Sequence, residues 1–197
     1  FSRAAHTYDK AARIQHLSAA ELAQQLQFLQ QANNSPMTGT WLDLGCGTGF
    51  AVPTLVKQGA QQVIGADLAH GMSTLSHDKL GQLPFTAITC DAENLPFASN
   101  SFDGIFSNLM IQWSEALDDL FYEAKRVLKP GALFAFSTLG PNTMHELKAA
   151  WLAVDPYVHV NQFDDSPKYP ESLRKCPVFR HSECTISCQL SPEHAAD

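Results

Sequence analysis

The stretch TWLDLGCGTGF at residues 40–50 constrains the fold of this chain more than any other feature of its sequence. It reads as a short apolar strand, then three glycines at every second position (Gly45, Gly47 and Gly49), then the start of a helix. Glycine has no Cβ, so the chain can turn sharply there and its backbone can approach a ligand closely. The N–H groups and the positive dipole end of the following helix favour a ligand in the same turn. We therefore expect a ligand site at the carboxyl end of a parallel strand.

Strand and helix patterns alternate after this stretch. Strands are expected at residues 62–68, 85–92, 102–110 and 132–139, and helices at 71–80, 114–128 and 142–154. Such alternation predicts an α/β fold with a doubly wound, mostly parallel, Rossmann-like sheet. Two helices are expected before the first strand, one within residues 1–15 and one starting at a capping box of Ser18 and Glu21. The basic residues at the end of the 114–128 helix, among them Arg126, are expected to be solvated.

Composition and charge disfavour several classes of function. The net charge of −7 argues against general nucleic-acid binding, and no apolar run reaches the ~18 residues that a membrane span needs. Five cysteines, an odd number, and no signal-peptide pattern favour a reduced cytoplasmic protein. The late cluster of Cys176, His181, Cys184 and Cys188 lacks the paired C-x-x-C spacing of zinc sites. Small buried side chains are the simpler interpretation, and no metal is expected.

The spacing of the glycine stretch indicates which ligand it binds. Its pattern is D-x-G-x-G-x-G, with Asp43 two residues before the first glycine, whereas dinucleotide-binding folds carry G-x-G-x-x-G. The pattern resembles motif I of the class I S-adenosylmethionine-dependent methyltransferases. The resemblance implies S-adenosylmethionine as cofactor, with its methionine part held by the loop that contains Cys46. It also implies that Asp43 meets the cationic half of this ligand, directly or through water.

Acidic residues also end the next two predicted strands. Asp67 has two interpretations, a ligand of the ribose diol, as in α/β nucleotide folds, or a simple helix cap. The glycine stretch upstream favours the ribose role, and Leu68 is assigned to the cofactor site with it. By resemblance to the same family, Asp91 accepts a hydrogen bond from the adenine amino group and Ala92 meets the ring. Asn108, at the end of the fourth predicted strand, completes the expected cofactor site.

Stretches outside the cofactor motifs are similar to one subfamily, the malonyl-acyl-carrier-protein O-methyltransferases of biotin synthesis. These stretches are FSRAAxxYxxxAxxQ at residues 1–15, SNLxxQW at 107–113, the region 146–155 and NxF at 161–163. The implied reaction is methyl transfer from S-adenosylmethionine to the free carboxylate of a malonyl thioester, an early step of biotin synthesis. A carboxylate with a pKa near 4 is already ionised at neutral pH, so positioning is expected to replace a catalytic base. The implied partner is malonyl-acyl-carrier protein or malonyl-coenzyme A.

The acceptor pocket is expected to contain hydrogen-bond donors for the malonyl carboxylate. By motif position these are Tyr8, Gln15, Gln112 and Trp113, with Arg3 or His159 as the charge partner. An acidic carrier protein calls for a basic patch, and Arg174, Lys175 and Arg180 form the local cluster that fits this role.

A single domain over residues 1–197 is expected, with a helical lid at 1–35, a cofactor-binding core at 36–155 and a C-terminal part at 156–197. The resemblance implies a seventh strand, for which no stretch is found, so the C-terminal part is expected to be incomplete; residues 179–190 could form a sixth strand. Three other functions remain open. They are a class I methyltransferase acting on a quinone or other small molecule, a nicotinamide-dependent oxidoreductase, and a cofactor-binding module without activity.

Overall fold

The computed structural model describes residues 9, 11–140 and 143–154. Its five strands are β1 (Thr40–Leu44), β2 (Gln62–Asp67), β3 (Phe85–Thr89), β4 (Phe102–Asn108) and β5 (Leu128–Ser137). They form one sheet in the order β3-β2-β1-β4-β5, and every neighbouring pair is parallel. The chain moves outward from β1 to β3 and then returns to β4 beside β1, so the order reverses between β1 and β4. This arrangement confirms the doubly wound α/β fold.

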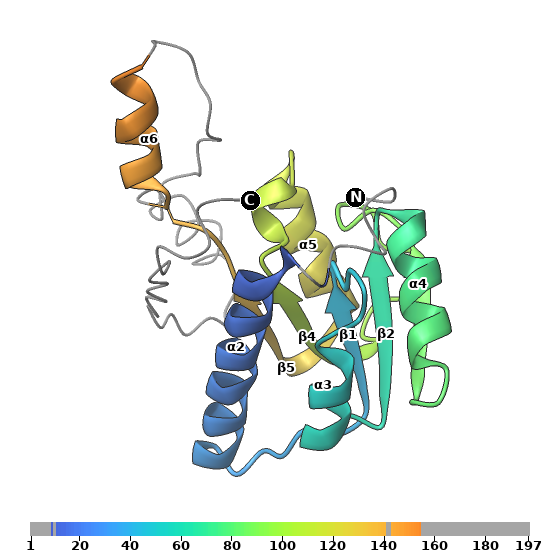
Figure 1. Cartoon of the computed structure of the whole chain (residues 1–197). Helices are drawn as coiled ribbons and strands as arrows, with labels where there is room; N and C mark the ends of the chain where they lie inside the picture. The colour runs from blue at the N-terminus through green and yellow to red at the C-terminus, as the bar shows by residue number, and fades with distance from the viewer. Residues whose placement is uncertain (1–8, 10, 141–142, 155–197) are drawn as a thin grey trace.

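Helices cover both faces of this sheet. The described helices are α2 (Arg13–Ala32), α3 (Val52–Gln58), α4 (His70–Leu80), α5 (Leu117–Val127), α6 (His145–Leu152) and a short 3₁₀ helix, η2 (Ile111–Trp113). In Figure 1, α2 and α3 lie in front of the sheet and α5 lies behind it. Trp41 of β1 packs in the core cluster that contains residues of α2 and α3, while Leu42 and Leu44 pack in the cluster that contains residues of α5. The alternation of side chains along each strand therefore builds two cores.

The helix predicted to start at Ser18 begins earlier, since α2 starts at Arg13, while most of the first predicted helix lies outside the described residues. The Ser18 side chain does not cap a helix; it is buried and its hydroxyl donates to the Ser137 hydroxyl of β5 at 3.1 Å. Glu21 accepts a hydrogen bond from Gln25 one turn later, at 2.9 Å. The prediction was wrong because the capping-box pattern is local. Neither glycine nor proline interrupts residues 13–32, and the contact with β5 stabilises the helix through this point.

The helix α2 ends at Ala32, where the chain turns toward β1. Asn34 adopts a left-handed conformation with φ of 50°. The N–H of Ser35 donates to the Gln30 carbonyl at 2.9 Å, and the N–H of Asn34 donates to the Gln31 carbonyl at 3.1 Å. This is the Schellman arrangement, which satisfies two carbonyls at the helix end.

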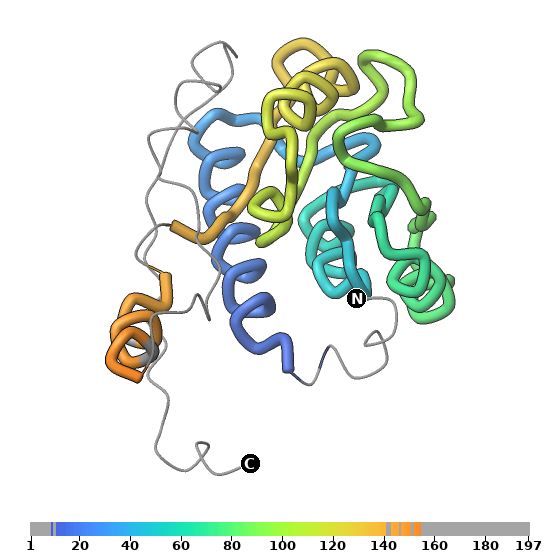
Figure 2. The backbone as a smooth tube through the Cα atoms, turned by 90° about the horizontal axis from the view of Figure 1, so that it is seen from above, coloured from blue at the N-terminus to red at the C-terminus, as the bar shows by residue number. Residues whose placement is uncertain are grey.

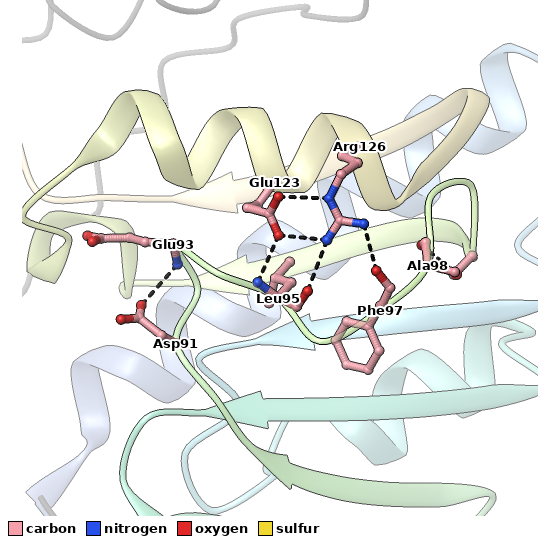
Figure 3. A network of polar contacts seen from close by, with 8 residues as sticks. Asp91, Glu93, Leu95, Phe97, Ala98, Glu123 and Arg126 are labelled. Carbon is pink, nitrogen blue, oxygen red and sulfur yellow. Dashed lines mark hydrogen bonds and ion pairs between the residues drawn. The ribbon is translucent and has the colours of Figure 1, made fainter.

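The connection from β3 to β4 carries no helix among residues 90–101 and lies against α5. Figure 3 shows how it is fixed. Arg126 of α5 donates to the carbonyls of Leu95 and Phe97 at 2.9 and 2.6 Å and pairs with Glu123 at 2.7 Å. Glu123 in turn accepts from the Leu95 N–H at 2.8 Å. The expectation of a solvated Arg126 was wrong, because the part-buried carbonyls of Leu95 and Phe97 need donors and Arg126 supplies them.

Several elements differ from the predicted ranges at their ends. The second and third strands stop at Asp67 and Thr89, and the fourth stops at Asn108. The fifth strand begins at Leu128, earlier than the predicted residue 132, and its register with β4 shifts between the Leu128–Phe102 and Leu133–Gly104 pairs. The residues between Leu128 and Leu133 therefore form an irregular part of β5, where the prediction placed a turn before the strand.

The last described helix, α6, stands apart from the sheet, as the view from above in Figure 2 shows. Residues 155–197 lie outside the described part of the chain, and so does the predicted strand at 179–190. The separation of the chain into a lid, a core and a C-terminal part stays a prediction.

Candidate functional site

The carboxyl ends of the five parallel strands lie along one edge of the sheet, and polar residues follow each of them. They are the glycine loop after β1, Asp67 at the end of β2, Asp91 after β3, Asn108 at the end of β4 and Ser137 at the end of β5. The loops after β1 and β4 are neighbours at the point where the strand order reverses. Ligands of open α/β sheets bind at this position.

The glycine loop after β1 is shaped by backbone that only glycine adopts easily. Gly45, Gly47 and Gly49 have φ values of 75°, 53° and 75°. The N–H groups of Gly45 and Cys46 both donate to the Ala66 carbonyl of β2, at 2.7 and 3.1 Å. The positive φ angles explain why glycine occupies every second position.

The three glycines have different surroundings, which separates structural from ligand-facing roles. A Cβ at Gly45 would lie 2.2 Å from Cγ of Met110, and a Cβ at Gly49 would lie 2.4 Å from Cδ1 of Leu80. A Cβ at Gly47 would meet no described atom within 4 Å. Gly45 and Gly49 therefore allow close packing of the protein on itself, whereas Gly47 borders open space where a ligand can approach the backbone.

Asp67 binds the glycine loop directly. One oxygen of its carboxylate accepts from the Gly47 N–H and the other from the Ala69 N–H, each at 2.8 Å. Burial raises the pKa of Asp67, and these two hydrogen bonds act in the opposite direction. The bond to Ala69 closes a turn at the start of α4, so the cap role is present. A carboxylate has about four acceptor positions, which leaves room for a ligand hydroxyl as well.

Asp43 is a buried acid without a hydrogen-bond partner at one oxygen. Its residue is 2% exposed, and Oδ2 has no partner among the described atoms. Burial, together with the charge of Asp67, raises the pKa of Asp43 to about 7. An unpaired buried carboxylate is costly, and a cation beside it would remove that cost. This atom is the clearest sign that the edge of the sheet is completed by a ligand.

Cys46 of the glycine loop is a buried thiol. Burial raises its pKa well above the ordinary value, and the charge of Asp43 acts in the same direction. The thiolate is the nucleophilic form of cysteine, so this side chain is unreactive at neutral pH. Its sulfur lies 2.9 Å from the position of a Cβ on Gly65, which places it in the packing between β1 and β2.

The loop after β3 begins with a turn closed by Asp91. Its carboxylate is exposed and accepts from the Glu93 N–H at 2.9 Å, while Ala92 is half-buried against the α5 side of the core. The Cys90 N–H donates to the Asp67 carbonyl at 3.1 Å, so Asp91 follows directly beside the end of β2. Leu68, assigned to the site with Asp67, is 73% exposed.

A hydrogen-bond network joins α2 to the ends of β4 and β5. The Asn108 amide donates to the Gln15 carbonyl at 3.0 Å and accepts from the Ser137 hydroxyl at 2.8 Å. That hydroxyl also accepts from Ser18 and from the Leu109 N–H, each at 3.1 Å. Gln15 thus reaches the site through its backbone, and sequence reasoning missed Ser137. A polar residue directly after the apolar FAF stretch was the available signal.

Gln112 is held at both ends of its amide. Its Nε2 donates to the Leu109 carbonyl at 2.7 Å, and its Oε1 accepts from the Thr138 hydroxyl at 3.4 Å. Leu109 has a φ of 49°, an unusual value for a residue with a side chain, which turns the chain out of β4 into η2. Trp113, at the end of η2, is 54% exposed.

A second set of contacts near the glycine loop was not anticipated from the sequence. The Thr48 hydroxyl donates to Asp9, and Lys79 of α4 forms an ion pair with the same carboxylate at 2.6 Å. His16 of α2 lies with its ring centroid 4.7 Å from that of Phe50. No local pattern announces these contacts, because they join segments far apart in the chain.

Other predicted residues lie outside the described part of the chain. They are Arg3, Tyr8, His159, the basic cluster of Arg174, Lys175 and Arg180, and the late group of Cys176, His181, Cys184 and Cys188. Within residues 9, 11–140 and 143–154, no group of three or more His, Cys, Asp or Glu side chains is arranged to hold a metal ion. No described helix has the length and apolar character to cross a bilayer.

A cavity of about 240 Å³ lies away from the acids, between α2 and the start of α3. It is lined by His16, Ala19, Ala20, Ala23, Phe50, Ala51 and Thr54. Its lining is mostly small and apolar, with His16 and Thr54 as the polar side chains, and it includes no carboxylate that would match a cationic ligand.

Comparison with known proteins identifies the fold and its chemistry. The profile of the methyltransferase domain family matches residues 42–136, from β1 to β5. A malonyl-[acyl-carrier protein] O-methyltransferase from Legionella pneumophila is 36% identical over 183 residues. The chain belongs to the class I S-adenosylmethionine-dependent methyltransferases. S-adenosylmethionine is the cofactor of this methyltransferase. The role of the glycine loop in binding it stays a prediction.

The relatives of this methyltransferase are longer than the chain. The alignment with the Legionella protein covers 92% of the chain and 61% of the relative. The biotin biosynthesis bifunctional protein BioHC of Cellvibrio japonicus is 46% identical over 165 residues, which cover 83% of the chain and 31% of that protein. The chain thus spans about 60% of the monofunctional relative and about 30% of the bifunctional one.

Solved structures agree with the fold. An S-adenosylmethionine-dependent methyltransferase from Mesorhizobium loti has a TM-score of 0.57 and 26% identity, over 69% of this chain and 72% of that one. The [4+2]-cyclase SpnF has a TM-score of 0.60 and 22% identity, over 77% of this chain and 56% of that one. The second likeness shows the fold alone, so the residues of the site must decide the reaction.

Proposed function

We propose that this methyltransferase transfers the methyl group of S-adenosylmethionine to the free carboxylate of a malonyl thioester, as an early step of biotin synthesis. Support for the acceptor comes from the relatives, which are named for this reaction or for biotin synthesis at 36–46% identity. Support for the donor site comes from the geometry. The observation that carries the proposal is the buried, unpaired carboxyl oxygen of Asp43 beside a glycine loop that is open at Gly47.

The residues at the sheet edge fit the donor. S-adenosylmethionine supplies an electrophilic methyl group on a positively charged sulfur. Asp43 would stabilise the cationic half of this ligand, and the backbone at Gly47 would lie against its methionine part. Asp67 has remaining acceptor positions for the ribose hydroxyls. The exposed carboxylate of Asp91 accepts a bond from its own turn and has acceptor positions left as well.

The acceptor side is formed by the loop after β4. A malonyl carboxylate is ionised at neutral pH and needs no base, so the protein must hold it in line with the methyl group and exclude water. The two hydrogen bonds of Gln112 fix its amide, and one N–H of that amide remains to hold the carboxylate. We propose that Gln112 and Trp113 position the malonyl group. Tyr8, Arg3 and His159 remain proposed contributors.

A methyl-transfer assay tests the proposal. Label from S-adenosylmethionine should appear as a base-labile methyl ester on malonyl-acyl-carrier protein, on malonyl-coenzyme A, or on both. Label on neither thioester, together with clear binding of S-adenosylhomocysteine, would refute the malonyl acceptor and favour a quinone or other small-molecule acceptor. The two thioesters in parallel also decide which carrier the enzyme accepts.

Replacing Gln112 by Ala should separate acceptor from donor binding. We expect kcat/KM for the malonyl thioester to fall at least about tenfold, because a hydrogen bond to a charged group contributes about 1.5–3 kcal/mol. The dissociation constant of S-adenosylhomocysteine should stay within about twofold of the wild-type value. Gln61→Ala, at an exposed residue before β2, is the matched control and should change neither quantity. Equal kcat/KM values for wild type and Gln112→Ala would remove Gln112 from the pocket.

A further inference from the structure

Hydrogen bonds link the loop after β3 to the segment after β4 through one carboxylate. Glu93, whose N–H donates to Asp91, accepts at Oε1 from the Ser114 hydroxyl at 2.6 Å. The same oxygen accepts from the N–H groups of Glu115 and Ala116 at 2.8 and 2.9 Å. The hydrogen bond from Ser114 lowers the pKa of Glu93, so this side chain stays ionised at neutral pH.

The two ends of this link belong to the two halves of the proposed site. Asp91 is the expected ligand of the adenine on the donor side. Ser114 directly follows η2, and its N–H donates to the Ile111 carbonyl at 3.1 Å, so it continues the helix that carries Gln112 and Trp113. Glu93 therefore bridges the donor side and the acceptor side.

The remainder of the loop is fixed by other contacts. Both backbone polar groups of Leu95 bond to α5, the N–H to Glu123 and the carbonyl to Arg126. Figure 3 shows Asp91 and Glu93 at one end of this network and the Glu123–Arg126 pair at the other. Leu95 is thus held by α5, whereas Glu93 bonds the 91–93 turn to residues 114–116.

We propose that Glu93 is a positioning residue that couples donor binding to acceptor binding. This inference rests on the proposed function. A ligand held by Asp91 restricts the 91–93 turn, and Glu93 then restricts residues 114–116 and η2. The acceptor consequently binds a site that is already ordered and loses less conformational entropy. Linkage requires the reciprocal effect, so the acceptor tightens the donor by the same factor.

Calorimetric titration tests the coupling in the full chain. S-adenosylhomocysteine is titrated with and without a saturating amount of the malonyl thioester that is methylated in the assay above. We expect the wild type to bind it at least about fivefold more tightly with the thioester present, the lower end of typical couplings. In Glu93→Ala this ratio should fall to about one. Glu115→Ala removes an adjacent exposed carboxylate and should keep the wild-type ratio.

Ser114→Ala provides a second variant that keeps the Glu93 charge and removes one of its three donors. Its ratio should fall between those of wild type and Glu93→Ala. Hydrogen exchange gives an independent readout. S-adenosylhomocysteine alone should slow exchange at the Glu115 and Ala116 amides in the wild type, and should not do so in Glu93→Ala.

A purely structural role for Glu93, as a cap of α5, predicts a different result. Both variants would then be less stable, yet the ratio and the ligand-dependent exchange would equal those of the wild type, which would overturn the coupling alone. A wild-type ratio of one would overturn it as well. Absence of S-adenosylhomocysteine binding, or of methyl ester formation by the wild type, would instead overturn the proposed function and this inference together.

Discussion

Asp43→Asn should weaken S-adenosylmethionine binding by roughly 100-fold while making the free protein more stable at pH 8. The loss of affinity follows from removing a buried negative charge opposite a cation, an effect of about 2–5 kcal/mol. The gain in stability follows from the unpaired Oδ2 of Asp43, which is desolvated in the free protein. The two results together test whether Oδ2 is an unpaired charge that a cationic ligand stabilises.

The size of the gain follows from the pKa. Burial raises the pKa of Asp43 from 3.8 to about 7, about three units, so the ionised form destabilises the fold by about 4 kcal/mol above pH 7. A buried amide with unpaired groups itself costs about 1–3 kcal/mol. The free energy of unfolding of Asp43→Asn should therefore exceed that of the wild type by about 1–3 kcal/mol at pH 8.

The same pKa predicts how stability depends on pH. The native state holds the Asp43 proton more tightly than the unfolded state, so its contribution to the free energy of unfolding falls as pH rises from about 4 to about 7. Denaturant unfolding of wild type and Asp43→Asn at several pH values measures this difference. Asp78→Asn, at an exposed position of α4, should match the wild type throughout. Wild-type affinity in Asp43→Asn would exclude Asp43 from the donor site.

Alanine at Gly45 and at Gly47 should have different consequences. At Gly45 the new Cβ would lie 2.2 Å from Met110 Cγ, at a φ of 75°. Left-handed strain of about 1–2 kcal/mol adds to overpacking of about 1–3 kcal/mol, so the free energy of unfolding should fall by about 2–5 kcal/mol. At Gly47 no described atom lies within 4 Å, so only the strain of about 1–2 kcal/mol remains.

The effect of Gly47→Ala should appear in binding. A methyl group in the space that borders the donor should weaken S-adenosylhomocysteine by at least about tenfold, or about 1.4 kcal/mol. Gly131→Ala is the matched control, since Gly131 also has a positive φ, 79°, and no described atom within 4 Å. It lies in the irregular first part of β5, away from the carboxyl ends of the strands. It should lose similar stability and keep full affinity. Equal affinities for both variants would show that no ligand approaches Gly47.

The sequence predicted the features that depend on local chemistry. The glycine loop could be found because three positive φ angles at every second residue require glycine. The alternation of strand and helix patterns along the chain was enough to predict a parallel sheet. At Asp67 the structure shows the cap, and the ribose role stays a prediction. Its carboxylate does close the turn that a cap would, yet it also binds the Gly47 N–H, which no spacing rule describes.

Contacts between distant segments were beyond the reach of sequence reasoning. Ser18 carried a valid capping pattern, but its partner is Ser137, 119 residues away. Arg126 had the position of a solvated helix end, but the loop without a helix after β3 needed its donors. Glu93 lies two residues after Asp91, and no sequence pattern indicated a role for it. Its hydrogen-bond partners come from the segment after β4, which is distant in the sequence.

The most direct test of the donor site is a titration of the isotope-labelled chain with S-adenosylhomocysteine, followed by backbone amide NMR. We predict that the largest shifts occur at Gly45, Gly47, Ala69 and Glu93, at the carboxyl ends of β1, β2 and β3, while Gly131 stays unchanged. Shifts confined to the cavity between α2 and α3, or no shifts at saturating ligand, would contradict the assignment of this edge as the cofactor site.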